Sequence, residues 1–269
     1  MGDHLKALSL YSPYGWKARI GLIVPSTNTI NEPEFWRMAP EGVGIFTARA
    51  MLLGRATPES YFEMAKAVSG ASDQLATAEV DIVAYGCTSG SFVCPMEDLI
   101  DDMQTRTGKP ALAAAGAVVA ALRALGAQRV ALATPYIDFV NQREREFLQS
   151  HGFELASLEA LDLGHTQEER RAIGRVPPEA IYRLARLADR PDADVVFISC
   201  TNLASLGVIQ RLEDELGKPV ITSNQACFWA CLRRLGLRDP VQGFGRLLSH
   251  CLAPIDDASF TVSSENRSI

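Results

Sequence analysis

Two cysteines of this 269-residue chain stand at the ends of two similar segments. Cys87 follows Ile-Val-Ala-Tyr-Gly and precedes Thr88, and Cys200 follows Val-Val-Phe-Ile-Ser and precedes Thr201. A thiolate can add to an electrophilic carbon, whereas a thiol can deliver a proton that its thiolate later removes. Two facing thiols can therefore handle protons on opposite faces of one carbon, or divide addition and proton transfer between them. We interpret Cys87 and Cys200 as the candidate catalytic residues.

Short polar side chains adjoin both thiols and suit the binding of a carboxylate. Hydroxyl, amide and backbone N–H groups can hold a small anion without a cation, and neither motif contains Lys or Arg. A helix that begins at such a thiol would stabilise the thiolate, so we expect a lowered thiol pKa. The candidate substrate-binding residues are Ser26, Asn28, Thr88, Ser89, Tyr136, Thr201 and Asn202.

Each of these residues also has a purely structural interpretation. A buried cysteine often acts as a small apolar side chain, an asparagine can cap a helix, and a tyrosine can simply pack. Ser223 and Asn224 are weaker candidates that fit a helix cap better. The other cysteines lack a partner in a matching segment and are interpreted as structural: Cys94, Cys227, Cys231 and Cys251. Cys227 and Cys231 are spaced for two metal ligands on one helix face, but no further ligands lie near them, so we expect no metal.

An internal duplication relates the two thiols. The matched segments, in chain order, are Arg19–Pro25 with Arg129–Pro135, Asn31 with Asn141, Asp81–Thr88 with Asp194–Thr201, Gly108–Pro110 with Gly217–Pro219 and Leu125–Gly126 with Leu235–Gly236. Their offsets lie between 109 and 113 residues. Ordered matches of this kind indicate a repeat rather than the general similarity of α/β strands.

Each half alternates short apolar runs with helical stretches. The predicted strands are residues 20–24, 44–50, 82–84 and 110–114 in the first half and 130–133, 153–161, 195–198 and 219–222 in the second. The predicted helices are residues 58–78, 117–125, 139–151, 179–189 and 206–216. Strands rich in Val and Ile that alternate with helices are typical of parallel sheets covered on both faces. We therefore predict an α/β fold of two similar lobes, each a parallel four-stranded sheet flanked by helices, related by a pseudo-two-fold axis.

The repeat also predicts the lobe boundaries and the place of the site. Residues 17–112 plus 223–253 form the predicted first lobe and residues 113–222 the second, while residues 1–16 and 254–269 are tails outside the repeat. Ligands of parallel α/β sheets bind beyond the carboxyl ends of the strands, where both cysteines stand. We expect the two thiols on opposite walls of one cleft between the lobes.

Composition excludes several other classes of function. The chain has 26 Lys and Arg against 32 Asp and Glu, a net charge of −6, which favours neither nucleic acid nor an anionic membrane as a partner. No apolar run reaches the roughly 18 residues of a membrane span, and the start lacks a secretory signal, so we expect a cytosolic protein with reduced thiols. No dinucleotide-binding, phosphate-binding or nucleophile-elbow motif is present, so we expect no cofactor. The scattered histidines fit surface positions: His4, His151, His165 and His250.

From about residue 19 to residue 248 the chain resembles the aspartate/glutamate racemase superfamily, and within it the branch of maleate cis-trans isomerases and arylmalonate decarboxylases. Cys87 and Cys200 match the two catalytic cysteines of the superfamily, and Tyr136 matches a tyrosine that hydrogen-bonds substrate. The loop Pro25–Thr29 resembles the isomerase loop whose asparagine binds a substrate carboxylate. The segments that resemble the decarboxylases more closely are residues 124–138 and 243–247 and the pair Thr88-Ser89.

The first thiol distinguishes the activities that this resemblance implies. The decarboxylases carry glycine where Cys87 stands and use only the second cysteine, as proton donor. The second asparagine of the isomerases has no clear counterpart, since residues 164–176 offer His165, Thr166 and Gln167 instead. The resemblance implies a cofactor-independent two-cysteine isomerase of a small carboxylate, with maleate to fumarate as the leading hypothesis. The alternatives are an arylmalonate decarboxylase, an amino-acid or hydantoin racemase and, more distantly, a non-catalytic two-lobed binding protein; a homo-oligomer is compatible with the sequence.

Overall fold

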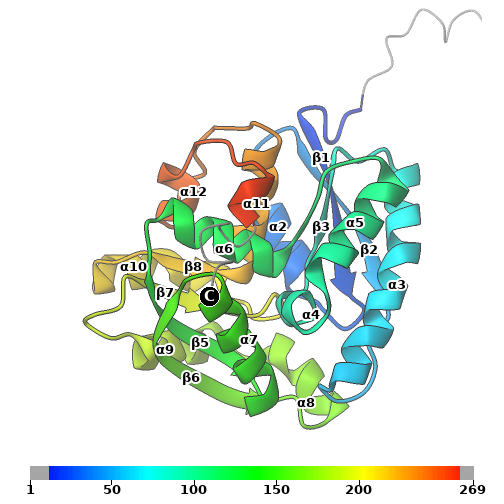
Figure 1. Cartoon of the computed structure of the whole chain (residues 1–269). Coiled ribbons are helices and arrows are strands. Elements are labelled where there is room, and N and C mark those ends of the chain that lie inside the picture. The colour runs from blue at the N-terminus through cyan, green and yellow to red at the C-terminus, as the bar shows by residue number, and fades with distance from the viewer. Residues whose placement is uncertain (1–11, 261–269) are drawn as a thin grey trace, which may run out of the picture.

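Two parallel four-stranded sheets form the frame of the computed structural model, which describes residues 12–260 (Figure 1). The first sheet has the order β2-β1-β3-β4 and the second the order β6-β5-β7-β8. The strands of the first sheet are β1 (Ala18–Pro25), β2 (Val43–Ala50), β3 (Ile82–Tyr85) and β4 (Ala111–Ala113). The strands of the second sheet are β5 (Arg129–Tyr136), β6 (Glu154–Leu163), β7 (Val195–Ile198) and β8 (Val220–Thr222).

The two sheets repeat each other in register as well as in order. Ile20 of β1 pairs with Ile82 of β3, and their repeat equivalents Val130 and Val195 pair in the same way between β5 and β7. β3 and β7 are apolar and buried along their whole length, because helices cover both faces of each sheet. The predicted α/β fold of two similar parallel sheets is confirmed.

Helices connect consecutive strands in both halves. In the first half these are α2 (Asn31–Met38), α3 (Pro58–Thr77), α4 (Thr88–Val93), α5 (Met96–Thr107) and α6 (Ala114–Ala124). In the second half these are α7 (Asp138–Ser150), α8 (Gln167–Ala172), α9 (Pro178–Ala188) and α10 (Ile209–Leu216), followed by α11 (Ser223–Arg234) and α12 (Arg246–His250). Short 3-10 helices span Ile173–Arg175, Leu206–Val208 and Asp257–Phe260. The helix predicted at 206–216 therefore begins as a 3-10 turn, and α6 begins three residues before the predicted start.

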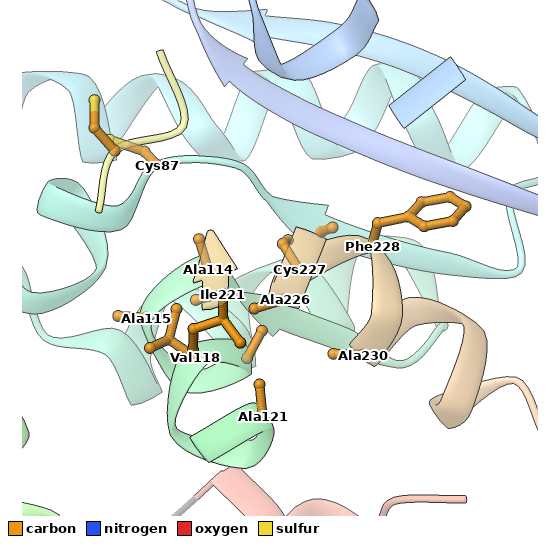
Figure 2. Close-up of a cluster of buried hydrophobic side chains, with 14 of the residues drawn as sticks. Cys87, Ala114, Ala115, Val118, Ala121, Ile221, Ala226, Cys227, Phe228 and Ala230 are labelled. Carbon is orange, nitrogen blue, oxygen red and sulfur yellow. The ribbon is translucent and has the colours of Figure 1, made fainter. Parts of the chain in front are cut away.

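The halves are joined through α6 and α11. Both helices present small side chains at their contact, among them Ala114 and Ala121 of α6 and Ala226 and Ala230 of α11 (Figure 2). Small side chains let two helices approach closely and exclude water. α11 also contacts α2, β3 and β4, which supports our proposal that residues 223–253 belong with the first lobe.

No helix within residues 12–260 is both long and apolar enough to cross a bilayer. The same part of the chain holds no group of three or more His, Cys, Asp or Glu side chains arranged for a metal ion. Cys227 and Cys231 are fully buried in α11, where they belong to the contact with the rest of the core. His151 is partly buried, His165 and His250 are exposed, and His4 lies outside the described residues.

Candidate functional site

A single cavity at the carboxyl ends of the two sheets is lined by both cysteines of the repeat. Cys87 and Cys200 lie on its wall with side chains from each half, and each stands two positions beyond the last residue of its strand, β3 or β7. The cavity is small, with a volume of about 40 Å³ for the centres of water-sized molecules. The arrangement therefore suits a small ligand that reaches both sulfur atoms.

Cys87 begins the short helix α4 and caps it with its own sulfur. The Gly90 N–H donates to Cys87 Sγ at 3.3 Å, and the Ser89 hydroxyl lies 3.7 Å from the same sulfur. A side chain at Gly90 would overlap the Tyr85 hydroxyl and approach the sulfur to 3.0 Å, so glycine permits this close cap. Burial raises the pKa of the Cys87 thiol, and the Gly90 N–H, the Ser89 hydroxyl and the charge of Arg170 act against that rise.

Cys200 sits in a different backbone environment. Its φ angle is +109°, a value that residues with a side chain rarely adopt, and its N–H donates to the Ser223 hydroxyl at 3.0 Å. The N–H of Asn202 donates to Cys200 Sγ at 3.4 Å. Burial raises the pKa of Cys200 to about 12, while hydrogen bonds from Tyr136 and Asn202 act in the opposite direction.

The prediction of a lowered pKa is wrong for both thiols. Burial is the largest influence on both sulfurs, because removal from water disfavours the charged thiolate. The predicted helix follows only Cys87, and that helix has just six residues. Cys200 is followed by turns and then by a 3-10 helix at Leu206–Val208.

Asn28 joins the two halves beside the cavity. Asn28 Nδ2 donates to Thr201 Oγ1 at 3.1 Å, and the Thr201 hydroxyl donates to the Gly86 carbonyl at 3.0 Å. The N–H of the next residue, Thr29, donates to Asn202 Oδ1 at 3.1 Å. The Asn28 side-chain oxygen accepts two backbone N–H groups at the start of α2. An amide nitrogen carries two hydrogens, so one N–H of Asn28 is left for a ligand.

The remaining predicted binding residues divide into two groups. Thr88, Ser89 and Tyr136 line the cavity, and the Thr88 hydroxyl is buried without a hydrogen-bond partner among the described residues. Burial raises the pKa of Tyr136 well above its ordinary value, so its hydroxyl stays protonated. Ser26 is not part of the cavity wall, since its hydroxyl accepts the Leu52 N–H at 2.9 Å.

Arg170 is a cavity residue that the sequence argument did not identify. It belongs to α8, within the region where His165, Thr166 and Gln167 were considered, and none of those three lines the cavity. The guanidinium lies 4.5 Å from the ring centre of Tyr61, a second unforeseen wall residue. The prediction of a site with neutral donors alone is therefore wrong, because the buried cation Arg170 contributes to the cavity wall.

Two buried glutamates lie behind the wall at repeat-equivalent positions. Glu34 of α2 accepts the Leu206 N–H at 2.9 Å and the side-chain amide of Asn224 at 2.6 Å. The same amide donates to the Thr201 carbonyl at 3.1 Å, so Asn224 links Glu34 to the segment after Cys200 and does not line the cavity. Glu144 of α7 accepts the Ser199 hydroxyl at 2.6 Å. Burial raises the pKa of Glu34 to about 7 and that of Glu144 to about 8. Their spacing of 110 residues equals a repeat offset, which is the signal that would have revealed the pair.

Comparison with known proteins identifies relatives with two activities. Over 86% of its length the chain is 31% identical to a maleate isomerase of Nocardia farcinica, covering 95% of that protein. Over 85% of its length it is 35% identical to an arylmalonate decarboxylase of Bordetella bronchiseptica, again covering 95% of the relative. A similar solved structure is a mutant of the N. farcinica maleate cis-trans isomerase with a covalently bound succinylcysteine intermediate. It has a TM-score of 0.79 and 28% identity, and the match covers 86% of this chain and 98% of that one.

A family model supports the same relationship. The model described as arylmalonate decarboxylase matches residues 20–248, a span that includes both sheets, both cavity cysteines and Arg170. The chain therefore belongs to the arylmalonate decarboxylase family, whose relatives here include maleate isomerases.

Proposed function

We propose that the protein is a cofactor-independent maleate cis-trans isomerase. The observation that carries this proposal is the presence of Cys87 and Cys200, from equivalent places in the two halves, on the wall of one small cavity. The maleate isomerase relatives and the succinylcysteine found in one of them support it, since that adduct requires a cysteine to add to the substrate's double bond.

The two thiols divide the chemistry. The Cys87 thiol loses its proton to solvent, and the resulting thiolate adds to one alkene carbon, which forms a C–S bond and places the electron pair of the double bond on the neighbouring carbon. Cys200 donates its proton to that carbon, which leaves a single bond about which the adduct rotates. The Cys200 thiolate then takes the proton back, the C–S bond breaks, and fumarate leaves as the Cys87 thiolate is released.

The side chains around the sulfurs suit the binding of two carboxylates. We assign this role to cavity residues that offer hydroxyl or amide donors: Asn28, Thr88, Ser89, Tyr136 and Asn202. Thr201 also lines the cavity, but its hydroxyl hydrogen is donated to the Gly86 carbonyl, so we assign it the role of holding Asn28 in place. Thr88 carries the argument furthest, because its buried hydroxyl has no partner in the described part of the chain and a bound carboxylate would supply one. Ser26 takes a supporting role, since its hydroxyl holds the Leu52 N–H.

Proton NMR of the purified protein with maleate tests the proposal directly. We expect the maleate signal to be replaced by that of fumarate without any added cofactor. Cys94→Ala serves as a control, because Cys94 is buried at the end of α4 but is not part of the cavity wall. Maleate that stays unchanged with the folded wild-type protein would refute the assignment.

A decarboxylase is the second candidate, favoured by the family match and by the 35% identical relative. Release of carbon dioxide from an arylmalonate, with no conversion of maleate, would replace the isomerase by this activity. A decarboxylase needs only one proton donor, so it would leave Cys87 without an evident role.

A further inference from the structure

Arg170 is a buried cation without a matching anion. Its side chain is only 7% exposed, and no carboxylate within residues 12–260 forms a salt bridge with it. Nη1 donates to the carbonyls of Gly54 and Arg55 and to the Ser60 hydroxyl, at 3.1 to 3.4 Å. Nη2 is buried and has no hydrogen-bond partner among the described residues. A buried charge of this kind is costly unless an anion pairs with it.

The position of Arg170 points to a ligand as the missing anion. The guanidinium belongs to the wall of the cavity that holds both sulfurs, and it lies over the Tyr61 ring on the Cys87 side. By contrast, Arg49 donates to the Asn28 carbonyl from outside the wall, is half exposed and pairs with Glu32 at 3.4 Å. Only Arg170 therefore brings a positive charge without a counter-ion to the cavity described here.

The first half of the chain holds this guanidinium in place. Arg170 comes from α8 of the second half, but its Nη1 partners belong to the first half: Gly54 and Arg55 lie between β2 and α3, and Ser60 lies in the first turn of α3. In the same place the Ala56 N–H donates to the Gly164 carbonyl at 3.0 Å. Figure 1 shows α8 beside the N-terminal end of α3. Because these contacts use Nη1, the N–H groups of Nη2 are left to bind a ligand in the cavity.

We infer that Arg170 forms an anion subsite that binds one carboxylate of a dicarboxylate substrate, while the hydroxyl and amide donors of the wall hold the other. A planar guanidinium binds a carboxylate through parallel N–H groups, and the bond is strengthened in a water-poor site. The inference rests on the proposed function and sharpens it, since it makes a second carboxylate a requirement for tight binding. It assigns to Arg170 the discrimination between dicarboxylates and monocarboxylates.

Binding of unreactive acids tests the subsite without turnover. Succinate and butyrate have the same four-carbon chain but two and one carboxylates, and isothermal titration at constant ionic strength gives their affinities. We expect the wild-type protein to bind succinate about 10- to 100-fold more tightly than butyrate. In Arg170→Met that ratio falls to near one and succinate affinity drops by a similar factor, while Arg170→Lys gives an intermediate ratio because Lys keeps the charge but loses the planar fork.

Arg190→Met is the matched control. Arg190 also donates through Nη1 to several carbonyls, those of Leu187, Ala188 and Asp189, but it does not line the cavity. The ratio of succinate affinity to butyrate affinity in Arg190→Met should equal that of the wild type. The melting temperature of each variant reports folding separately, and if Arg170→Met does not fold, the wild-type ratio and Arg170→Lys decide.

Two outcomes would overturn the subsite: a wild-type protein that binds butyrate as tightly as succinate, or a folded Arg170→Met that keeps the preference for succinate. These outcomes are separate from failure of the proposed function. An Arg170-dependent succinate preference in a protein that leaves maleate unchanged would keep the subsite and reject the isomerase. Conversion of maleate with an unchanged KM in folded Arg170→Met would keep the isomerase and reject the subsite.

Discussion

The two halves share a backbone plan but have diverged in the polar groups behind the cavity. Glu34 and Glu144 occupy equivalent positions on α2 and α7. Both oxygens of Glu34 are bound, one by Leu206 N–H and one by Asn224, whereas Glu144 Oε2 has no partner among the described residues. The repeat equivalent of Asn224 is Ala115, which cannot donate. One half therefore satisfies its buried carboxyl, while the other depends on the proton that the raised pKa of Glu144 retains.

The same divergence separates the two thiols. The charge of Arg170 acts on Cys87, and a backbone N–H and a hydroxyl also lower the pKa of that thiol. Cys200 instead has the Cys87 sulfur and the Glu144 carboxyl as neighbours, and both raise its pKa. A cation favours the thiolate and a nearby acid disfavours it. The comparison supports Cys87 as the nucleophile and Cys200 as the proton carrier.

Removal of the first thiol should have the largest effect. Cys87→Gly deletes the atom that forms the bond to substrate, so we expect maleate isomerisation to fall by at least about 10⁴-fold. Glycine is accepted at a helix N-cap, so the fold should persist. Fumarate formation followed by NMR measures the loss, with Cys94→Ala as the control. Isomerisation that survives in Cys87→Gly would contradict the role of this sulfur.

Replacement of the second thiol should block the reaction at a later step, after the substrate has been added to Cys87. In Cys200→Ser the addition to Cys87 remains open but proton return is impaired, so we expect about a 10³-fold loss of turnover. Mass spectrometry of a digest after incubation with maleate should find an adduct on Cys87. If no adduct forms on either cysteine, the division of roles is rejected. If an adduct accumulates on Cys200 in the Cys87→Ser protein, the two roles are reversed.

The pH dependence should follow the ionisation of the first thiol. Since burial raises the Cys87 pKa above its ordinary value of 9, the thiolate fraction should rise up to about tenfold per pH unit between pH 7 and 9. Cys200, with a pKa of about 12, stays protonated over this range and imposes no falling limb. We therefore expect kcat/KM to rise steadily with pH. A flat profile of kcat/KM against pH would show that ionisation of the Cys87 thiol does not control the reaction. The rate at which Cys87 is alkylated should show the same rise with pH.

The smallest effect concerns stability. The pKa of Glu144 is about 8 in the folded protein against an ordinary value of 4.5, so the folded state holds its proton more tightly. This contribution is complete below about pH 4.5 and is lost as the pH rises through 8. In Glu144→Gln this side chain cannot ionise. The decrease in the free energy of unfolding between about pH 4.5 and 8 should therefore be smaller than in the wild type by a few kcal/mol.

Glu34→Gln provides the comparison for this measurement. The pKa of Glu34 is about 7, so its contribution is lost over a narrower interval that ends near pH 7. Urea unfolding at several pH values measures both variants. Equal pH dependence in the wild type and in Glu144→Gln would show that the Glu144 carboxyl does not hold its proton in the folded state.

The fold could be predicted because short-range sequence patterns are enough to reveal the repeat. Apolar runs with Val and Ile specify the strands, and the matching offsets specify that the two sheets have the same order. The cavity thiols could be predicted for the same reason, since each stands just beyond the end of a central strand. The asymmetry between the thiols could not, because it depends on which side chains distant in sequence surround each sulfur.

Arg170 shows where local patterns end. It stands in the charged segment Gln167–Ala172 beside Glu168, Glu169 and Arg171, and nothing in that spacing distinguishes the buried side chain from its more exposed neighbours. Its direction is decided by partners more than 100 residues earlier, such as Arg55 and Ser60. A motif search around the cysteines therefore finds only neutral donors and misses the cation.

The unusual backbone at Cys200 has a consequence for how such a protein can change over time. A φ of +109° costs a residue with a side chain on the order of 1–3 kcal/mol, a cost that glycine would not bear. Glycine at this position would relax the chain but would remove the sulfur from the cavity. A single substitution to glycine would thus exchange the sulfur for a gain in folding stability, so the backbone strain and the thiol at this position are kept or lost together.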